Sequence, residues 1–257
     1  MILLFAIVSH LIDIHIIIVG DEMKYIVQIR YIIFIVCLFS HFIAYAAISD
    51  TELLRYAIKI DGKSYEEKMI VHRTNDLMQY ESCGNFTDPR IYEPGGNHCW
   101  DVVCTFDGQP RLIDYHAGPN KMHMTFEKNG LFEMKGFWDG KQCYEKKNFD
   151  KRVYVEVTGL VRTMDLSSKA PVTFDFVRIT KFPAVSSHDL FFQVLDDVII
   201  DVPAGRFHCK KIMLSASGYK GFFFKAYFYV TTDERQLIVR VDNVPIGGMT
   251  QLIEVSF

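Results

Sequence analysis

The sequence lacks the short motifs by which common catalytic sites are recognised. It contains no Gly-x-Ser-x-Gly turn, no Cys-x-x-Cys pair and no glycine-rich loop ending in Lys-Ser or Lys-Thr. It also lacks an excess of charge of either sign, because its formal net charge is −3 over 257 residues. A nucleic-acid partner therefore has no electrostatic support, and neither an enzymatic activity nor a cofactor is expected.

Linkers, repeats and long amphipathic helices are missing as well. No Pro-rich or Gly/Ser-rich stretch divides the chain, and no segment of three helical turns has one apolar face. The chain does have abundant aromatic residues, at 14% of its length, which is enough to build a sizeable core. These features indicate a single β-rich domain.

The segment 23–46, MKYIVQIRYIIFIVCLFSHFIAYA, predicts export. Lys24 and Arg30 supply a positive start, an apolar run follows, and Ala44 and Ala46 give the small-x-small pattern that signal peptidase needs. We expect a signal peptide that is cleaved near Ala46, and a periplasmic or secreted domain that spans residues 47–257.

The residues before Met23 fit this scheme poorly. They are apolar but contain Asp13, and a charge in mid-span costs roughly 2.5–3.5 kcal/mol on insertion scales. We interpret residues 1–22 as an upstream extension that results from a start codon assigned too early, and we expect Met23 to be the true initiator. The alternative is that residues 1–46 anchor the protein in a membrane, since each apolar stretch approaches the ~20 residues that a span requires.

Alternation of apolar and polar residues dominates the rest of the chain and favours antiparallel strands. It runs through residues 54–60, 122–126, 132–134, 153–157 and 237–241. Asn129-Gly130 predicts a hairpin because both residues tolerate a positive φ. We expect a mostly β protein with few short helices, one of them over residues 189–196, and a long loop over residues 75–98.

Two runs, Phe222–Val230 and Val198–Val202, are apolar on both faces. Such a strand has the core on one side and a helix, a second sheet or an apolar ligand on the other. A lipid-binding concavity would be lined by the aromatic and methionine residues Phe222, Phe224, Tyr227, Tyr229, Met122, Met124, Phe132 and Met134. The alternative is that these side chains pack the core, where methionine and aromatic residues fill irregular gaps.

The C-terminal part of the chain contains a recognisable series of elements. Residues 198–212 form a strand, a Pro203-Ala204-Gly205 turn and a return strand, and residues 226–230 and 237–241 form two further strands around a Thr-Asp-Glu-Arg turn. Together with Leu160–Leu166, these elements resemble a family of exported bacterial proteins of unknown function. The resemblance covers residues 158–257.

That family is similar in fold to the lipoprotein carriers LolA and LolB, which hold acyl chains in the concave face of a curved sheet. The resemblance implies a curved antiparallel sheet, or open half-barrel. It implies no catalytic residues, because one fold hosts many functions.

The cysteines predict disulfides, which are the default in an oxidising compartment. We expect pairing among Cys83, Cys99, Cys104 and Cys143, whose connectivity the sequence leaves open, and a buried unpaired Cys209. The alternative is a metal site that uses Cys99, Cys104 and nearby histidines. The histidines have neither finger nor protease spacing, so we expect no metal.

Three functions remain open from the sequence. The leading hypothesis is a non-catalytic envelope protein that binds an apolar or amphiphilic, lipid-like ligand in the concave face. The second is a structural or interaction module that meets another envelope protein through an edge strand or the loop 75–98. The third is an enzyme not recognised by motif, which would gain support if His116, His123 and Asp114 met in one cleft.

Overall fold

The structure is a computed structural model, and the residues that it describes all belong to one compact unit, Ser49–Phe257. They are residues 50–257 apart from 61, 75–76, 86–96, 106–108, 119, 128, 139, 151, 156, 182–183, 219–220, 222–223 and 244–246. The expected upstream extension and signal peptide lie outside the described residues. Within the described part of the chain, no helix is long and apolar enough to cross a membrane.

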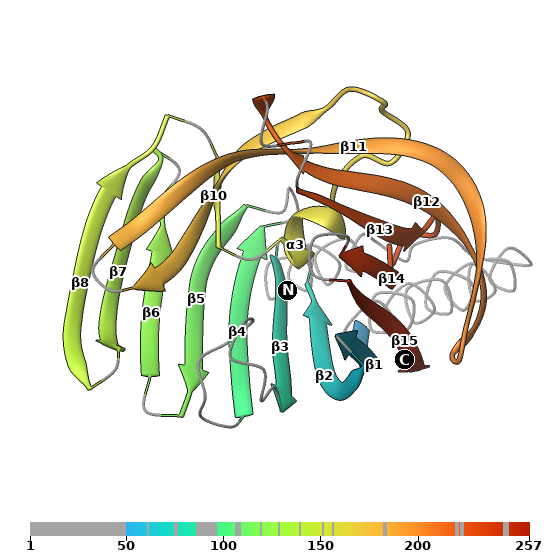
Figure 1. Cartoon of the computed structure of the whole chain (residues 1–257), viewed down its shortest axis with the longest axis horizontal. Coiled ribbons are helices and arrows are strands. Elements are labelled where there is room, and N and C mark those ends of the chain that lie inside the picture. The colour runs from blue at the N-terminus through green and yellow to red at the C-terminus, as the bar shows by residue number, and fades with distance from the viewer. Residues whose placement is uncertain are drawn as a thin grey trace, which may run out of the picture. The chain divides into compact units, whose positions relative to one another are not determined.

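The described residues form a single sheet of 15 strands (Figure 1). In chain order the strands are β1 (Asp50–Ile60), β2 (Lys63–Arg73), β3 (Leu77–Asn85), β4 (Asn97–Thr105), β5 (Pro110–Ala117), β6 (Asn120–Phe126), β7 (Leu131–Trp138), β8 (Lys141–Asn148), β9 (Val153–Tyr154), β10 (Val172–Lys181), β11 (Ala184–Val202), β12 (Gly205–Ala216), β13 (Lys225–Thr231), β14 (Ile238–Asn243) and β15 (Gly248–Ser256). One short helix, α3 (Thr158–Val161), lies between β9 and β10 in the described chain.

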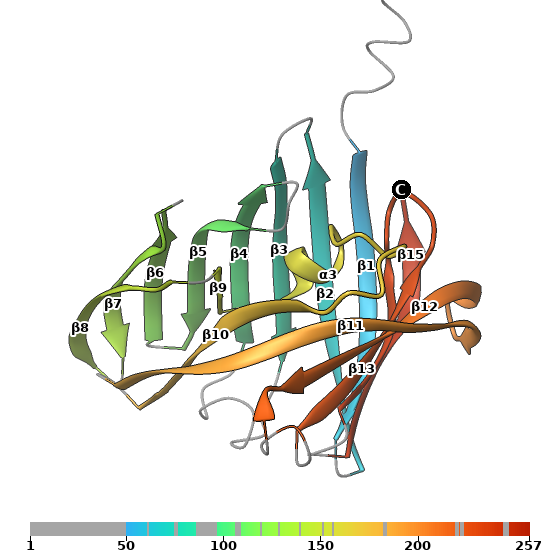
Figure 2. The same ribbon diagram turned by 90° about the horizontal axis from the view of Figure 1, so that it is seen from above.

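The sheet consists of two antiparallel meanders that are joined through their edge strands. Strands β1 to β8 pair with their sequence neighbours, and so do β10 to β15; β1 then pairs with β15. The sheet ends at β8 on one side and at β9 on the other, so it is open, and it curves until β10 passes in front of β5 to β7 (Figures 1 and 2). The expected fold class, a curved open antiparallel sheet with few short helices, is confirmed.

The core fills the concave side of this curve. One apolar cluster covers the inner face of β1 to β8, and a second covers the inner face of β10 to β14. Helix α3 lies between them, since Leu160 belongs to the second cluster while Gly159 approaches Met78 and Cys104 of the first. A β-carbon added at Gly159 would lie 3.0 Å from the Cys104 sulfur, so the helix packs closely on the sheet.

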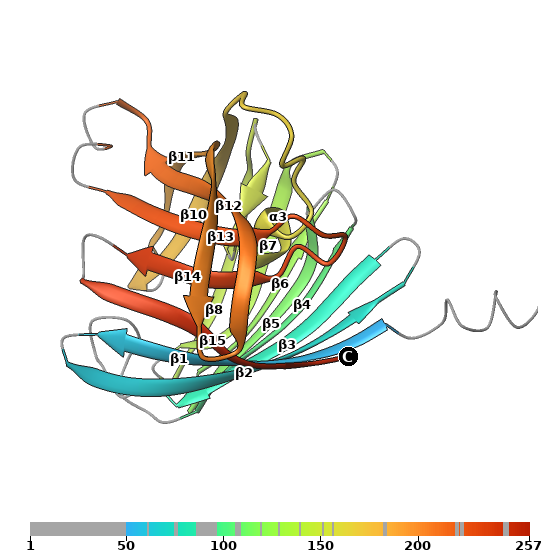
Figure 3. The same ribbon diagram turned by 90° about the vertical axis from the view of Figure 1, so that its right-hand side faces the viewer.

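Strand β13 is buried on both faces, as the sequence predicts. Phe228 and Val230 face the concave core, whereas Tyr227 and Tyr229 face the opposite side. The hairpin of β11 and β12 bends back over that opposite side, across β13, β14 and β15 (Figure 3). The partner on the second face is therefore another part of the same sheet.

Two features join the bent hairpin to the surface beneath it. Phe207, near its turn, packs against Cys209, Tyr229 and Val239, and the backbone N–H of Ala204 donates to the carbonyl of Leu252 at 3.3 Å. A bulge in β11 between Val194 and Asp197 interrupts the register at the bend, which is where an extra residue increases strand curvature.

The expected loop over residues 75–98 is wrong for its first part. Strand β3 occupies residues 77–85, and Met78, Tyr80 and Ser82 point into the core. Gln79 and Glu81, which alternate with these buried residues, lie on the outer face of the strand. Residues 97–98 begin β4, and residues 86–96 lie outside the described residues.

The expected short helix over residues 189–196 is also wrong. This segment belongs to β11, where Leu190, Phe192 and Val194 alternate toward the core. The expected strand over residues 153–157 is confined to Val153 and Tyr154, because the next described residues turn into α3. Both differences arise because short apolar runs fit a helix or a strand equally well.

A buried ionic cluster ties the two meanders together. The Glu52 side chain on β1 has no exposed surface; it pairs with Arg162 after α3, with Arg73 on β2 at 3.2 Å and with Arg235 in the β13–β14 turn at 3.6 Å. Arg162 also donates to the carbonyl of Arg235 at 3.1 Å. A buried charge requires such partners, so the cluster fixes four segments that are distant in sequence.

Candidate ligand site on the concave face

The concave face of β6 and β7 is where the structure places four of the predicted ligand-lining residues. Met122, Met124, Phe132 and Met134 are all within 2% of complete burial. Phe149, Val153 and Val155 from the chain after β8, and Val177 from β10, belong to the same cluster. The middle of the concave face is thus covered by the protein's own chain.

The other predicted lining residues lie elsewhere. Tyr227 and Tyr229 lie under the β11–β12 hairpin, on the far side of the sheet. Phe224 packs at the border of the second core cluster, and Phe222 lies outside the described residues. The eight residues therefore do not share one cavity.

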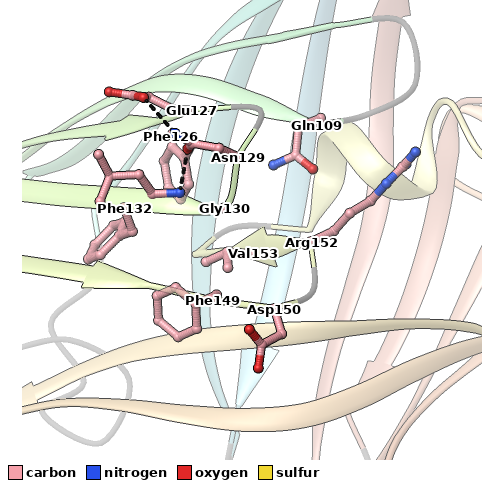
Figure 4. A pocket seen from close by; sticks show the side chains of 11 residues that line it. Gln109, Phe126, Glu127, Asn129, Gly130, Phe132, Phe149, Asp150, Arg152 and Val153 are labelled. Atoms are coloured by element: carbon pink, nitrogen blue, oxygen red, sulfur yellow. Dashed lines mark hydrogen bonds between the residues drawn. The ribbon is translucent and has the colours of Figure 1, made fainter.

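A pocket of about 280 Å³ opens where the concave face of β6 and β7 ends (Figure 4). Its apolar part consists of Phe126, Phe132, Phe149, Leu131 and Val153. The remaining lining residues are polar or charged, except for a glycine in the turn: Gln109, Glu127, Asn129, Gly130, Asp150 and Arg152. Phe132 is the predicted lining residue that reaches this pocket.

The aromatic floor of the pocket comes from three neighbouring rings. The ring centroids of Phe126 and Phe132, which are register partners on β6 and β7, lie 5.3 Å apart. Phe149, which follows β8, approaches Phe132 edge-on at 6.2 Å. These are favourable geometries for aromatic pairs, so the floor is well packed.

The Asn129-Gly130 turn forms one wall, as the hairpin signal in the sequence predicts. Gly130 has φ +87°, its N–H donates to the carbonyl of Glu127 at 3.1 Å, and Asn129 accepts the N–H of Leu131 at 3.0 Å. The carbonyl of Gly130 accepts the N–H of Phe149 at 3.0 Å, which brings the segment after β8 against the turn. Gly130 therefore fixes both the turn and the opposite wall.

Three charged side chains lie around the mouth of the pocket: Glu127, Asp150 and Arg152 (Figure 4). The arrangement offers a polar group of a ligand both a cation and carboxylates above an apolar floor. Sequence reasoning did not find Phe149, Val153 or Arg152, because these residues meet the hairpin only through the chain reversal after β8. The aromatic residue directly after the β8 run was the one local signal available.

The far end of the same concave face carries both tryptophans of the chain. The ring of Tyr115 lies between them, with centroids 4.3 Å from Trp100 and 6.1 Å from Trp138. At this end, Gly136 on β7 lets the backbones of β6 and β7 approach closely. A β-carbon at this position would lie 2.0 Å from the carbonyl oxygen of Lys121. Both tryptophans are half-buried and close this end of the core.

One disulfide joins two of the four candidate cysteines. Cys83 on β3 and Cys99 on β4 are register partners and are bonded. Cys104, Cys143 and Cys209 are buried and form no disulfide within the described part of the chain. Burial raises the pKa of the Cys143 thiol. Burial, and to a smaller extent the negative charge of Asp233, raises the pKa of the Cys209 thiol to about 12. Both thiols therefore stay protonated and unreactive.

The titratable residues considered for an enzyme lie on the convex face, away from the pocket. The Nδ1 of His123 and the Oδ1 of Asp114 are 2.7 Å apart, and both side chains are about one-third exposed. His116 is exposed on the same face, opposite Cys99. Among the described residues, no group of three or more His, Cys, Asp or Glu side chains is placed to hold a metal ion.

A row of carboxylates crosses this convex face. Glu81, Asp101 and Asp114 are register neighbours on β3, β4 and β5. The pKa of Asp101 is raised mainly by its partial burial and then by the negative charge of Glu81. His116 lowers this pKa, and Asp114 raises it to a smaller extent. Like charges opposite each other destabilise a sheet, so this row is held together by the rest of the fold.

Comparison with protein-family models gives no match, and no curated protein matches the sequence. Several solved structures resemble the fold in part, among them the following three. A β-barrel-like protein of the domain of unknown function DUF1849 from Brucella abortus has a TM-score of 0.49 and 6% identity over 80% of this chain and 97% of its own. An exported protein with a YmcC-like fold from Bacteroides fragilis has a TM-score of 0.36 and 10% identity over 80% and 95%. A DUF1329 protein from Desulfovibrio piger has a TM-score of 0.25 and 9% identity over 81% and 84%.

Proposed function

We propose that this protein is an exported, non-catalytic envelope protein that binds an amphiphilic ligand in the pocket at the end of β6 and β7. The observation that carries the proposal is the pairing of an aromatic floor, formed by Phe126, Phe132 and Phe149, with a rim that includes the charged residues Glu127, Asp150 and Arg152. Ligand sites combine mostly apolar walls with a few polar groups in this way. Export rests on the pattern of residues 23–46.

The size of the pocket limits the ligand. At about 280 Å³ it lies near the lower end of the range for small-molecule sites, so it suits one chain end or one small ring. The remainder of a longer ligand would lie outside the mouth. We therefore propose that the pocket binds the apolar end of an acyl-type ligand while the polar part contacts the rim.

The methionines beside the floor support this proposal. Met124 and Met134 are register partners on the same face as Phe126 and Phe132, and both are buried. Methionine side chains are flexible and adapt to ligands of different shape. A floor flanked by methionines can repack around chain ends of different length.

The test combines native mass spectrometry of protein recovered from the periplasmic fraction with titration of a fluorescent fatty acid. We expect an additional mass that is lost on denaturation, and saturable binding of the probe. Leu131→Trp, which enlarges one of the residues that line the pocket, is expected to weaken binding at least tenfold. Leu77→Trp is the matched control, because Leu77 is 39% exposed on β3 and does not line the pocket.

Urea unfolding of both variants verifies that each is folded before binding is compared. Equal binding by the wild type and a folded Leu131→Trp variant would place the ligand elsewhere. If neither a bound mass nor probe binding is found, the ligand-carrier proposal fails and the interaction-module hypothesis takes its place.

A further inference from the structure

The convex face near the β8 edge of the sheet carries two exposed aromatic side chains. Phe137 on β7 is 51% exposed and Tyr144 on β8 is 57% exposed. Phe137 is opposite Gln142, so Tyr144 is its diagonal neighbour across the two strands. Diagonal side chains on one face of a sheet lie about 7–8 Å apart, so the two rings form one small apolar area.

Lysines alternate with these rings in the register of the sheet. Lys121 on β6 is opposite Phe137, and Lys135 on β7 is opposite Tyr144. Both lysines are exposed, as is Lys146 on the same face of β8. We call this set, Lys121, Lys135, Phe137, Tyr144 and Lys146, the edge patch. Its acidic neighbours among the described residues are Glu133, 3.8 Å from Lys146, and Asp114, which is diagonal to Lys121 and paired with His123. The three lysines still give the patch a positive balance.

The positive balance is local. The whole chain has a formal charge of −3, and the neighbouring convex face of β3 to β5 carries the row of Glu81, Asp101 and Asp114. The three lysines of the edge patch lie on β6, β7 and β8, the three strands that end the sheet on this side (Figure 1). A surface complementary to the edge patch is anionic, extended in two dimensions and able to accept aromatic rings.

We infer that the edge patch docks the protein on an anionic lipid surface. Aromatic side chains that are surrounded by lysines suit the bilayer interface, because the rings enter the headgroup region while the ammonium groups approach anionic lipids. A peptide that adds to β8 as a strand would be bound through the backbone edge, in the plane of the sheet. The exposed rings and lysines point out of that plane, which favours a flat partner over an added strand.

The inference is independent of the ligand proposal, since the edge patch and the pocket lie on opposite faces and share no residue. The two proposals can therefore fail separately. If both hold, docking by the convex face leaves the pocket on the concave face uncovered.

The experiment is co-sedimentation of the exported protein with vesicles. One set is pure phosphatidylcholine, and the other contains about one-third phosphatidylglycerol. We expect binding to the anionic vesicles that decreases at high ionic strength, since salt screens exposed charges. Lys121→Gln combined with Lys135→Gln is expected to weaken this binding about 10–30-fold, because each lysine near a membrane surface contributes on the order of 1 kcal/mol.

Phe137→Ser combined with Tyr144→Ser tests the rings and is expected to weaken binding at least fivefold. The control for the rings is Ile199→Ser, since Ile199 is 48% exposed on the β11–β12 hairpin and lies outside the edge patch. The control for the charges is Lys59→Gln combined with Lys169→Gln, both of which are exposed elsewhere. All variants carry the same N-terminus, so differences between them report the patch.

Equal binding by the patch variants and the controls would overturn the inference. So would the absence of wild-type binding to anionic vesicles, which would leave an acidic polypeptide as the alternative occupant of the patch. Binding that is equal on neutral and anionic vesicles and insensitive to Lys121 and Lys135 would also contradict it.

Discussion

Glu52 is a single carboxylate that compensates three arginines, of which Arg162 is almost fully buried. Glu52→Gln is expected to lower the free energy of unfolding by about 3–5 kcal/mol, because it leaves Arg162 buried without an opposite charge. Urea unfolding measures the effect. Glu66→Gln is the control, since Glu66 pairs with Arg55 on the exposed surface and its loss is expected to change little. Similar small effects for both variants would contradict the role assigned to the buried cluster.

Gly130 is required both by its backbone conformation and by its contact with Phe149. In Gly130→Ala the new β-carbon would lie 2.1 Å from the Phe149 carbonyl oxygen at φ +87°. We expect a loss of stability well above 1 kcal/mol together with weaker ligand binding. Gly140→Ala separates the two causes, since Gly140 has φ +70° and open space around it. Its cost should be about 1–2 kcal/mol from the backbone alone, and binding should be unchanged.

Asp101 gives the convex face a dependence on pH. Its pKa in the folded protein is raised above the ordinary value of 3.8, so the ionised side chain destabilises the fold above the folded pKa. This penalty disappears as the pH falls below 3.8. Asp101→Asn is expected to raise stability at pH 7 by less than about 1 kcal/mol, because the group is half-exposed and screened. Thermal unfolding at pH 7 and pH 3 should show a gain at the higher pH only; an equal gain at both would contradict it.

At the scale of elements, the disulfide Cys83–Cys99 links two register partners on the neighbouring strands β3 and β4. It closes a loop with a sequence separation of 16, for which the chain-entropy model gives a stabilisation of about 3 kcal/mol. Cys83→Ser combined with Cys99→Ser should lower stability by roughly 2–3 kcal/mol. Reductant should destabilise the wild type but not this variant. Sensitivity of the variant to reductant would mean that another pair of cysteines also bonds.

The elements that the sequence predicts well are those with one buried face. Period-two alternation identified β1, β6 and β7, and Asn129-Gly130 marked the turn between the last two. The segment 189–196 was mistaken for a helix because its apolar residues are dense, and only the sheet around it makes it a strand. The bent β11–β12 hairpin could not be predicted, because the surface that it covers is formed by β13 to β15, which follow in the chain.

Of the candidate site, only the part formed by β6, β7 and the turn between them could be predicted from the sequence. The inward positions of Phe126 and Phe132 follow from alternation along their strands, and the turn follows from Asn129-Gly130. Phe149 and Val153 meet these residues through a reversal of the chain that no local pattern encodes. Sequence reasoning therefore found aromatic and methionine side chains that share the concave face, but it grouped them with Tyr227 and Tyr229, which are separated from them by the thickness of the sheet.

At the scale of the whole molecule, the pairing of β1 with β15 is the one ladder that joins the two meanders. A chain that ends at Asn243 would lack β15 and leave β1 and β14 with unpaired edges. We expect this truncated protein to aggregate, because long exposed strand edges template pairing with other chains. Size-exclusion chromatography and urea unfolding test this. A monomeric, cooperatively folding truncation would show that β15 is not needed to protect the edges of β1 and β14.

The same pairing sets an order of events during synthesis. Strands β2 to β8 pair only with their neighbours in sequence, so they can form as soon as they are made, whereas the outer edge of β1 must wait for the last strand of the chain. Until β15 has been made, β1 therefore presents an open edge beside a partly formed concave core. Slow, long-range closure of this kind exposes a chain to misassembly, and we expect the yield of native protein to depend on holding that edge apart from other chains until β15 arrives.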